Sequence, residues 1–104
     1  MKRVAFKMKL KDGFEAEYKK RHDEIWPDLA NELTKAGVTD YSIYLDSESL
    51  ILFAVQKLSD NTTAHNLPQS NIVKKWWDYM ADIMETNPDH SPVCSVLPEV
   101  FHLR

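Results

Sequence analysis

The sequence predicts a small α+β domain of the ferredoxin-like class, with its elements in the order β-α-β-β-α-β. Three observations support this prediction. The first segment alternates apolar and polar residues, two longer segments repeat apolar residues every three or four positions, and two strand-like runs joined by a polar turn lie between them. The chain has 104 residues, so we expect residues 1–104 to form a single domain.

The first strand is expected at residues 4–10, where the sequence is VAFKMKL. Its even-numbered residues are apolar and share one face, because successive side chains of a strand point to opposite faces. Helical spacing then extends from Phe14 to Leu33, and Gly37 is the expected terminating residue. Pro27 lies inside this segment and has no N–H, so the helix is expected either to kink or to restart there.

Two strands are expected within residues 40–58, joined by the polar turn DSES at residues 46–49. The second strand is apolar on both faces, which predicts a central position in the sheet. Residues 59–70 are polar and contain a proline, so we expect a loop with no more than one helical turn. A second helix is expected over residues 72–84, where bulky apolar residues recur at helical spacing.

The last elements are a loop at residues 87–95 and a strand at residues 96–103, interrupted or placed at an edge because of Pro98. In the ferredoxin-like arrangement, both helices cover one face of the sheet and leave the other face open. Because the central strand is apolar on both faces, an isolated chain would expose an apolar patch there, which is typical of an interface. We therefore predict a homodimer that is packed sheet to sheet with twofold symmetry.

The composition of the chain bears on its partners and its compartment. The formal net charge is −3 and no cluster of basic residues stands out, which argues against nucleic acid as a partner. Cys94 is the only cysteine, so an internal disulfide is excluded and a reducing compartment is favoured. The N-terminus lacks the apolar stretch of a signal peptide, and no apolar run approaches the ~20 residues of a membrane span. We expect a cytoplasmic protein with no membrane partner.

His22 is the first candidate for chemistry. In an ideal helix it falls within the apolar arc, with Tyr18 one turn before it and Trp26 one turn after it. One interpretation is a structural histidine that is hydrogen-bonded inside the core. The other is an acid–base group in a lined pocket, since an ordinary imidazole pKa of about 6.5 makes both protonation states available near neutral pH. The adjacent Arg21 and Asp23 point to other sectors, so neither is an obvious orienting partner.

Aromatic residues are frequent for so short a chain, among them Tyr41, Tyr44, Trp76, Trp77 and Tyr79. Adjacent helical residues are about 100° apart, so Trp76 and Trp77 cannot point the same way. Core packing is one interpretation of this pair. Recognition of a sugar is the other, because an indole can cover the C–H face of a pyranose while tyrosine hydroxyls and an indole N–H meet the sugar hydroxyls.

Other side chains give weaker signals. His65, His90 and His102 are far apart and form no H-x-x-x-H or H-x-H pair, so no metal site is expected. Cys94 has no partner nearby in the sequence, and no glycine-rich phosphate loop occurs. The residues alone indicate a small dimeric α+β protein with a one-histidine, aromatic-lined site, and they do not name a substrate.

Four motifs follow one another along the chain. They are Y-x-x-R-H-x-x-I-W-P at residues 18–27, Y-x-I-Y-L-D at 41–46, W-W-x-Y-M-x-D at 76–82 and N-P-D-x-S-P-V at 87–93. Each is weak alone, but in this order and in a chain of this length they resemble the L-rhamnose mutarotase family over essentially the whole chain. Residues 60–71 depart from the family pattern and contain none of the motif residues.

The resemblance implies a dimeric α-β barrel built from ferredoxin-like halves. It implies an isomerase that interconverts α- and β-L-rhamnopyranose, with a monosaccharide as its partner and with neither a metal nor an organic cofactor. The histidine of the first motif acts as the proton donor in this family, and it is His22 here. The resemblance assigns substrate binding to Tyr18, Tyr41, Trp76 and Trp77.

Two other functional classes are alternatives to an L-rhamnose mutarotase. Dimeric α-β barrels also host cofactor-free monooxygenases and haem-handling proteins, which oxygen uptake or a haem absorption band would reveal. A non-enzymatic sugar-binding module would bind the sugar while anomer exchange stayed at its spontaneous rate.

Overall fold

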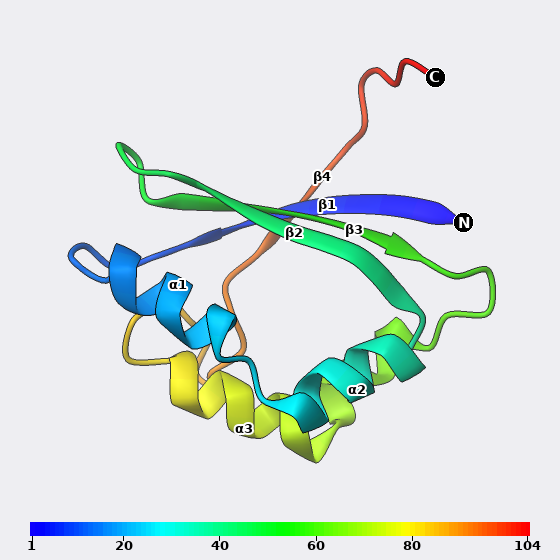
Figure 1. The fold of residues 1–104 in the computed structure, drawn as a ribbon. Helices are drawn as coiled ribbons and strands as arrows, with labels where there is room; N and C mark the ends of the chain where they lie inside the picture. The colour runs from blue at the N-terminus through cyan, green and yellow to red at the C-terminus, as the bar shows by residue number, and fades with distance from the viewer.

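The computed structural model describes residues 1–104, in which four strands form a sheet with the helices on one side of it (Figure 1). The elements are β1 (Lys2–Lys9), α1 (Glu15–Asp23), α2 (Pro27–Lys35), β2 (Val38–Asp46), β3 (Ile51–Leu58), the short 3₁₀ helix η1 (Ala64–Gln69), α3 (Asn71–Met80) and β4 (Ser95–Leu97). The predicted ferredoxin-like order is confirmed, with the first helical segment divided into α1 and α2. None of these helices has both the length and the apolar character that a membrane span requires.

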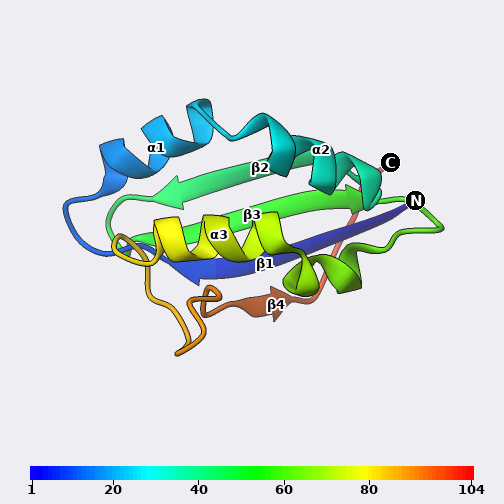
Figure 2. The same cartoon turned by 90° about the horizontal axis from the view of Figure 1, so that it is seen from below.

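The sheet is antiparallel with the strand order β2-β3-β1-β4, and Figure 2 shows the helices lying across one face of it. β3 pairs with β1 on one side and with β2 on the other, so its predicted central position is confirmed. On β3, Leu52 and Ala54 are buried, whereas Phe53 and Val55 are 36% and 37% exposed. The alternating side chains therefore supply the core on one face and leave an open apolar face on the other.

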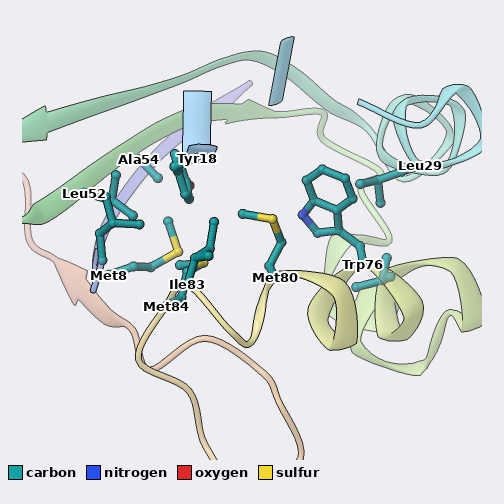
Figure 3. Close-up of a cluster of buried hydrophobic side chains, with 11 residues drawn as sticks. Met8, Tyr18, Leu29, Leu52, Ala54, Trp76, Met80, Ile83 and Met84 are labelled. Carbon is teal, nitrogen blue, oxygen red and sulfur yellow. The ribbon is translucent and has the colours of Figure 1, made fainter. Parts of the chain in front are cut away.

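The core lies between the helices and the inner face of the sheet (Figure 3). Leu10, Leu52 and Ile83 are its most deeply buried large side chains. The backbone N–H of Lys11 donates to the Ile83 carbonyl oxygen at 2.9 Å, which ties the end of β1 to the segment after α3. No buried side-chain nitrogen or oxygen lacks a hydrogen-bond partner, as is usual for buried polar side chains.

Pro27 divides the first helical segment into two helices. α1 ends at Asp23, and α2 begins with Pro27 in its first turn, where a missing N–H leaves no helical hydrogen bond unmade. Trp26 has the extended conformation (φ −62°, ψ 130°) that is favoured before proline. Of the two expected outcomes, the restart at Pro27 is the one that is found.

The helix α3 is shorter than predicted and ends at Met80 rather than at Met84. Residues 81–83 form a turn, after which Met84 forms a β-bridge with Leu10. Ile83 and Met84 are nevertheless buried. Helical spacing therefore identified side chains that face the core, but it was wrong about the end of the helix. The turn after α3 directs Ile83 and Met84 into the core as a longer helix would.

The final strand is also shorter than predicted. β4 comprises only Ser95–Leu97 at the edge of the sheet, and residues 98–104 have no regular structure. Pro98 has no N–H to donate to a neighbouring strand, so the pairing stops just before it. The interruption and the edge position are confirmed, whereas the expected extension to residue 103 was wrong.

Gly37 lies in a tight corner after α2, as the predicted terminating residue. Its φ is +87°, a conformation that strains residues with a side chain. A Cβ atom there would overlap the Ser59 Oγ atom and lie 3.3 Å from the Thr62 Cα atom. The Gly37 carbonyl oxygen also accepts the Ser59 backbone N–H at 2.9 Å, which restricts any backbone movement. Gly13 has the same φ of +87°, but nothing lies within 4 Å of the corresponding position.

The two glycines therefore make a matched pair for measuring the effect of this corner. Gly13→Ala should lower the free energy of unfolding by about 1–2 kcal/mol, the cost of a left-handed alanine. Gly37→Ala adds the overlap with Ser59 and Thr62, so its loss should be larger by ~1 kcal/mol or more. Urea unfolding of both variants checks the order, and equal losses would contradict this description of the corner.

Candidate active site

Tyr18 and His22 lie one turn apart on α1 and form the centre of the candidate site. Tyr18 is buried and is the only buried residue of α1, whereas His22 is half-buried. Their rings are stacked, with centroids 4.3 Å apart and an interplanar angle of 28°. The predicted ridge of Tyr18 and His22 is therefore confirmed.

The imidazole of His22 is oriented by the backbone of its own helix. Its Nδ1 atom lies 3.0 Å from the carbonyl oxygen of Tyr18. A carbonyl oxygen can only accept, so Nδ1 carries the hydrogen and donates it. The other ring nitrogen, Nε2, is then the atom that gains or loses a proton when His22 titrates.

The surroundings of His22 favour its neutral form. Burial lowers the pKa of His22 below its ordinary value of 6.5, because the imidazolium loses hydration. The hydrogen bond to the Tyr18 carbonyl and the charge of Asp23 act in the opposite direction and are smaller effects. The imidazolium of His22 is consequently a stronger acid than a histidine in water.

Trp76 of α3 covers His22 from the opposite helix. The two rings meet edge to face, with centroids 5.4 Å apart at 89°. Trp76 is 9% exposed, and Figure 3 shows it among the core side chains together with Tyr18. Trp76 therefore packs into the core, which is one of the two interpretations of the tryptophan pair.

Trp26 does not continue the ridge of Tyr18 and His22 as the ideal helix predicted. α1 ends before it, and its ring instead meets Trp76 at 5.0 Å and 89°. It also stacks on Tyr79 at 5.4 Å and 29°. The helix break at Pro27 thus turns Trp26 toward α3, where its ring packs against those of Trp76 and Tyr79.

Tyr41 reaches the site from β2. The register of β2 with β3 shifts between Thr39 and Ser42, next to Asp40 at φ 49°. Ser42 pairs with Val55 of the open face, so the alternation directs Tyr41 to the helix side. Burial of its hydroxyl raises the pKa of Tyr41 to about 12, although the residue as a whole is 38% exposed.

The hydroxyl of Tyr18 is influenced by that of Tyr41. Burial raises the pKa of Tyr18 well above its ordinary value, and the charge that Tyr41 could carry raises it further. Both tyrosines therefore remain neutral phenols across the physiological pH range. Neutral phenols can donate and accept hydrogen bonds, which suits contact with sugar hydroxyls.

Trp77 is the predicted site residue that stands apart. It is half-buried and packs against the core, but it makes none of the ring contacts that join His22, Trp76 and Tyr79. A rotation of about 100° per residue separates it from Trp76, as expected. The structure thus brings Tyr18, His22 and Trp76 into direct contact and places Trp77 beside them on the next sector of α3.

Arg21 is a residue that sequence reasoning missed. Its side chain is 10% exposed and donates hydrogen bonds to groups near the end of α3. Residue spacing on α1 alone did not indicate these partners. The partners are 58 and 61 positions away in the sequence. The R-H pair of the first motif was the one signal that could have singled it out.

Two surface hollows lie away from this site. One is lined by residues of α2 and the start of α3, including Glu32 and Asn71, and the other lies near Arg3 and His102. No set of three or more His, Cys, Asp or Glu side chains gathers in a way that could hold a metal ion. His22 lines neither hollow and is half-buried.

The fold and the site define a ferredoxin-like α+β protein with one oriented histidine among aromatic rings. The profile of the L-rhamnose mutarotase family matches residues 3–103. The chain belongs to the L-rhamnose mutarotase family. A relative named L-rhamnose mutarotase from Bacteroides thetaiotaomicron is 62% identical over 103 residues, 99% of each chain. Another from Flavobacterium johnsoniae is 56% identical over 101 residues, 97% of this chain and 94% of its own.

A solved structure confirms the fold class. The crystal structure of L-rhamnose mutarotase from Formosa agariphila matches this chain with a TM-score of 0.94 and 51% identity, and the match covers 100% of both chains. The departure noted at residues 60–71 is therefore compatible with the same fold, and η1 with the loop around it occupies this segment.

The lowered pKa of His22 predicts how stability depends on pH. Below about pH 6.5 the unfolded chain protonates this histidine before the folded protein does, so acid favours unfolding through His22. We expect the wild-type protein to lose more unfolding free energy between about pH 7.5 and about pH 5 than His22→Gln loses, as measured by urea unfolding at both pH values. A loss in the variant that equals or exceeds the wild-type loss would show that burial does not lower this pKa.

Proposed function

We propose that the chain is an isomerase that interconverts the α and β anomers of L-rhamnopyranose. Family membership supports the substrate class. The single observation that carries the mechanism is the orientation of His22, whose Nδ1–H is bonded to the Tyr18 carbonyl while Nε2 is left for proton exchange. The proposal has one small monosaccharide as the partner of the site and involves neither nucleic acid nor a membrane.

The reaction requires only proton transfers at two oxygens. The anomeric hydroxyl loses a proton as the C1–O bond to the ring oxygen breaks, and the ring oxygen gains a proton, which gives the open-chain aldehyde. Rotation about the adjacent carbon–carbon bond and the reverse transfers then close the ring to the other anomer. No hydride moves and no carbon–carbon bond breaks, so a positioned acid and base are sufficient.

His22 is the acid in this proposal. Protonated at Nε2, it donates that proton to the ring oxygen, and the neutral imidazole takes a proton back when the ring closes. The lowered pKa strengthens the imidazolium as an acid. A positioned acid–base group typically contributes 10²–10⁴-fold in rate, so its removal should be readily measured.

The base that accepts the anomeric proton is best assigned to water. Tyr18 acting through a water molecule is the alternative base, but its raised pKa disfavours the phenolate that a base would need. Tyr18 and Tyr41 are proposed instead to bind sugar hydroxyls as neutral phenols. Trp76 and Trp77 are proposed to bind the sugar through an indole face and an indole N–H.

Replacement of His22 tests the catalytic assignment. His22→Gln should slow anomer exchange of L-rhamnose by about 10²–10⁴-fold, because glutamine keeps a polar side chain but exchanges no proton. NMR saturation transfer between the anomeric protons measures the rate. His65→Gln is the matched control, since His65 is exposed on η1 and makes none of the contacts of the site.

The outcomes separate the enzyme from its alternatives. A folded His22→Gln protein with undiminished exchange would refute the acid role. Wild-type protein that binds L-rhamnose in calorimetry but leaves exchange at the spontaneous rate would be a sugar-binding module instead.

The open face of the sheet supports a homodimer as part of the proposal. Tyr44, Phe53 and Val55 are exposed on this face at 64%, 36% and 37%. The C-terminal tail, residues 98–104, extends away on the same side of the sheet in Figure 1. Its apolar residues Val100 and Phe101 are 93% and 76% exposed. A second copy packed sheet to sheet would cover these groups with complementary apolar surface.

The compartment is the last part of the proposal. Cys94 is free and exposed, which suits the reducing conditions of the cytoplasm.

The dimer is tested by placing a charge on the open face. Val55→Lys should convert a dimer into a monomer in size-exclusion chromatography with light scattering, because a buried lysine without a partner is strongly unfavourable in an interface. Ala16→Lys, at an exposed position of α1, is the control and should leave the mass unchanged. A wild-type mass of one chain would overturn the dimer and leave the proposed reaction intact.

A further inference from the structure

We propose that Arg21 is the positioning residue of the site, because it ties α1 to the end of α3 and so holds the His22 ring against Trp76. This inference rests on the proposed function, in which His22 is the acid. In this proposal Arg21 makes no contact with the sugar and acts only through the placement of its neighbour.

The guanidinium of Arg21 is bonded in three directions. Its Nε donates to Glu17 Oε2 at 2.7 Å, one turn earlier on α1. Its terminal nitrogens donate to both carboxylate oxygens of Asp82, at 2.9 Å and 3.3 Å, and to the Tyr79 carbonyl oxygen at 2.7 Å. The side chain thus joins α1 to the last turn of α3 and to the turn that follows it.

Burial distinguishes this contact from an ordinary surface ion pair. The Arg21 side chain is 10% exposed, whereas those of Glu17 and Asp82 are 39% and 65% exposed. The hydrogen bond from Arg21 lowers the pKa of Asp82 below its ordinary value. A guanidinium with so little solvent exposure keeps one orientation, because its N–H groups must bond all of these acceptors at once.

The same guanidinium begins a series of ring contacts that leads back to His22. It lies 4.3 Å above the centroid of the Tyr79 ring, within the range of a cation–π interaction. Tyr79 meets Trp76 at 5.7 Å, and Trp76 meets His22 at 5.4 Å. Because Arg21 and His22 are neighbours on α1, these contacts close a circuit between the two helices.

α1 depends on this circuit because it has little apolar surface of its own. Its sequence is EAEYKKRHD, and Tyr18 is its only buried residue. The break at Glu24–Trp26 separates it from α2, so α2 cannot fix its position as a continuous helix would. The contacts of Tyr18, His22 and Arg21 therefore determine where the imidazole lies relative to α3.

Arg21→Lys tests the inference without a change of charge. Lysine cannot bond both the Asp82 carboxylate and the Tyr79 carbonyl in the same fixed fork. We expect kcat for anomer exchange to fall about 10–100-fold with a smaller change in KM, since a displacement of roughly 1 Å at the reacting group can have this effect. We also expect the pKa of His22, measured by NMR titration, to rise toward about 6.5 as the ring becomes more hydrated.

The NMR readout isolates position from charge. The groups that influence the titration of His22 are the Tyr18 carbonyl and Asp23 of α1, and Tyr41 of β2 lies beyond Tyr18. Trp76 of α3 covers the ring and is uncharged. The lysine variant leaves all of these groups in the chain and keeps a positive charge at residue 21, so a rise in the pKa reports movement of the ring.

Lys19→Gln is the matched control. Lys19 forms an i,i+4 ion pair with Asp23 on the same helix at 2.7 Å, but the two side chains are 78% and 61% exposed. The control should keep kcat within about twofold, because an exposed pair of this kind contributes little. Asp82→Ala provides a second test at an exposed position if Arg21→Lys fails to fold, and it should also lower kcat and raise the pKa of His22.

The inference and the proposed function fail in different ways. A folded Arg21→Lys or Asp82→Ala protein with the wild-type His22 pKa and the wild-type kcat would overturn the positioning role. Wild-type protein without anomer exchange would overturn the proposed function, and the NMR titration of His22 would still decide whether Arg21 positions the ring.

Discussion

The hydrogen bond from His22 Nδ1 to the Tyr18 carbonyl is the constraint on which the rest of the site depends. It uses an acceptor of the same helix, one turn away, so the ring direction is set by helix geometry rather than by a distant side chain. It also leaves Nε2 as the proton-exchanging atom. The stacked Tyr18 ring and the edge of Trp76 then limit the hydration of the imidazole and lower its pKa. One hydrogen bond and two ring contacts thus fix the direction of the imidazole and favour its neutral form.

The fold supplies this arrangement through two interruptions of regular structure. Pro27 stops the first helical segment, which frees Trp26 to turn toward α3 and pack behind Trp76. The irregular pairing near Asp40 sets the side on which Tyr41 emerges from β2. Bulges and helix breaks of this kind commonly re-aim side chains at functional sites. The sheet itself provides a rigid floor, because β3 is paired on both sides and its inner face is buried.

Local patterns in the sequence predicted much of this molecule. Alternation identified β1, and an apolar run on both faces identified β3 as the central strand. The missing N–H of Pro27 correctly offered a restart as one of two outcomes. The pairing of Tyr18 with His22 also followed from helical spacing, because both lie on one continuous helix. These features depend on residues that are close together in the chain, where elementary geometry decides the result.

Features that depend on distant contacts could not be predicted in this way. Ile83 and Met84 fitted a helical period, yet Ile83 is buried from a turn and Met84 from a bridge to Leu10, just after β1. Arg21 was not recognised as an orienting partner, because its own partners on and after α3 are 58 and 61 positions away in the sequence. The catalytic assignment of His22 likewise came from resemblance to a family, since spacing alone fitted a structural histidine equally well. A crystal structure of the protein with bound L-rhamnose tests this central assignment most directly. We expect His22 Nε2 to lie within roughly 2.6–3.2 Å of the sugar ring oxygen, with the Trp76 indole beside the same ring. A sugar bound with Nε2 turned away from both the ring oxygen and the anomeric hydroxyl would contradict it.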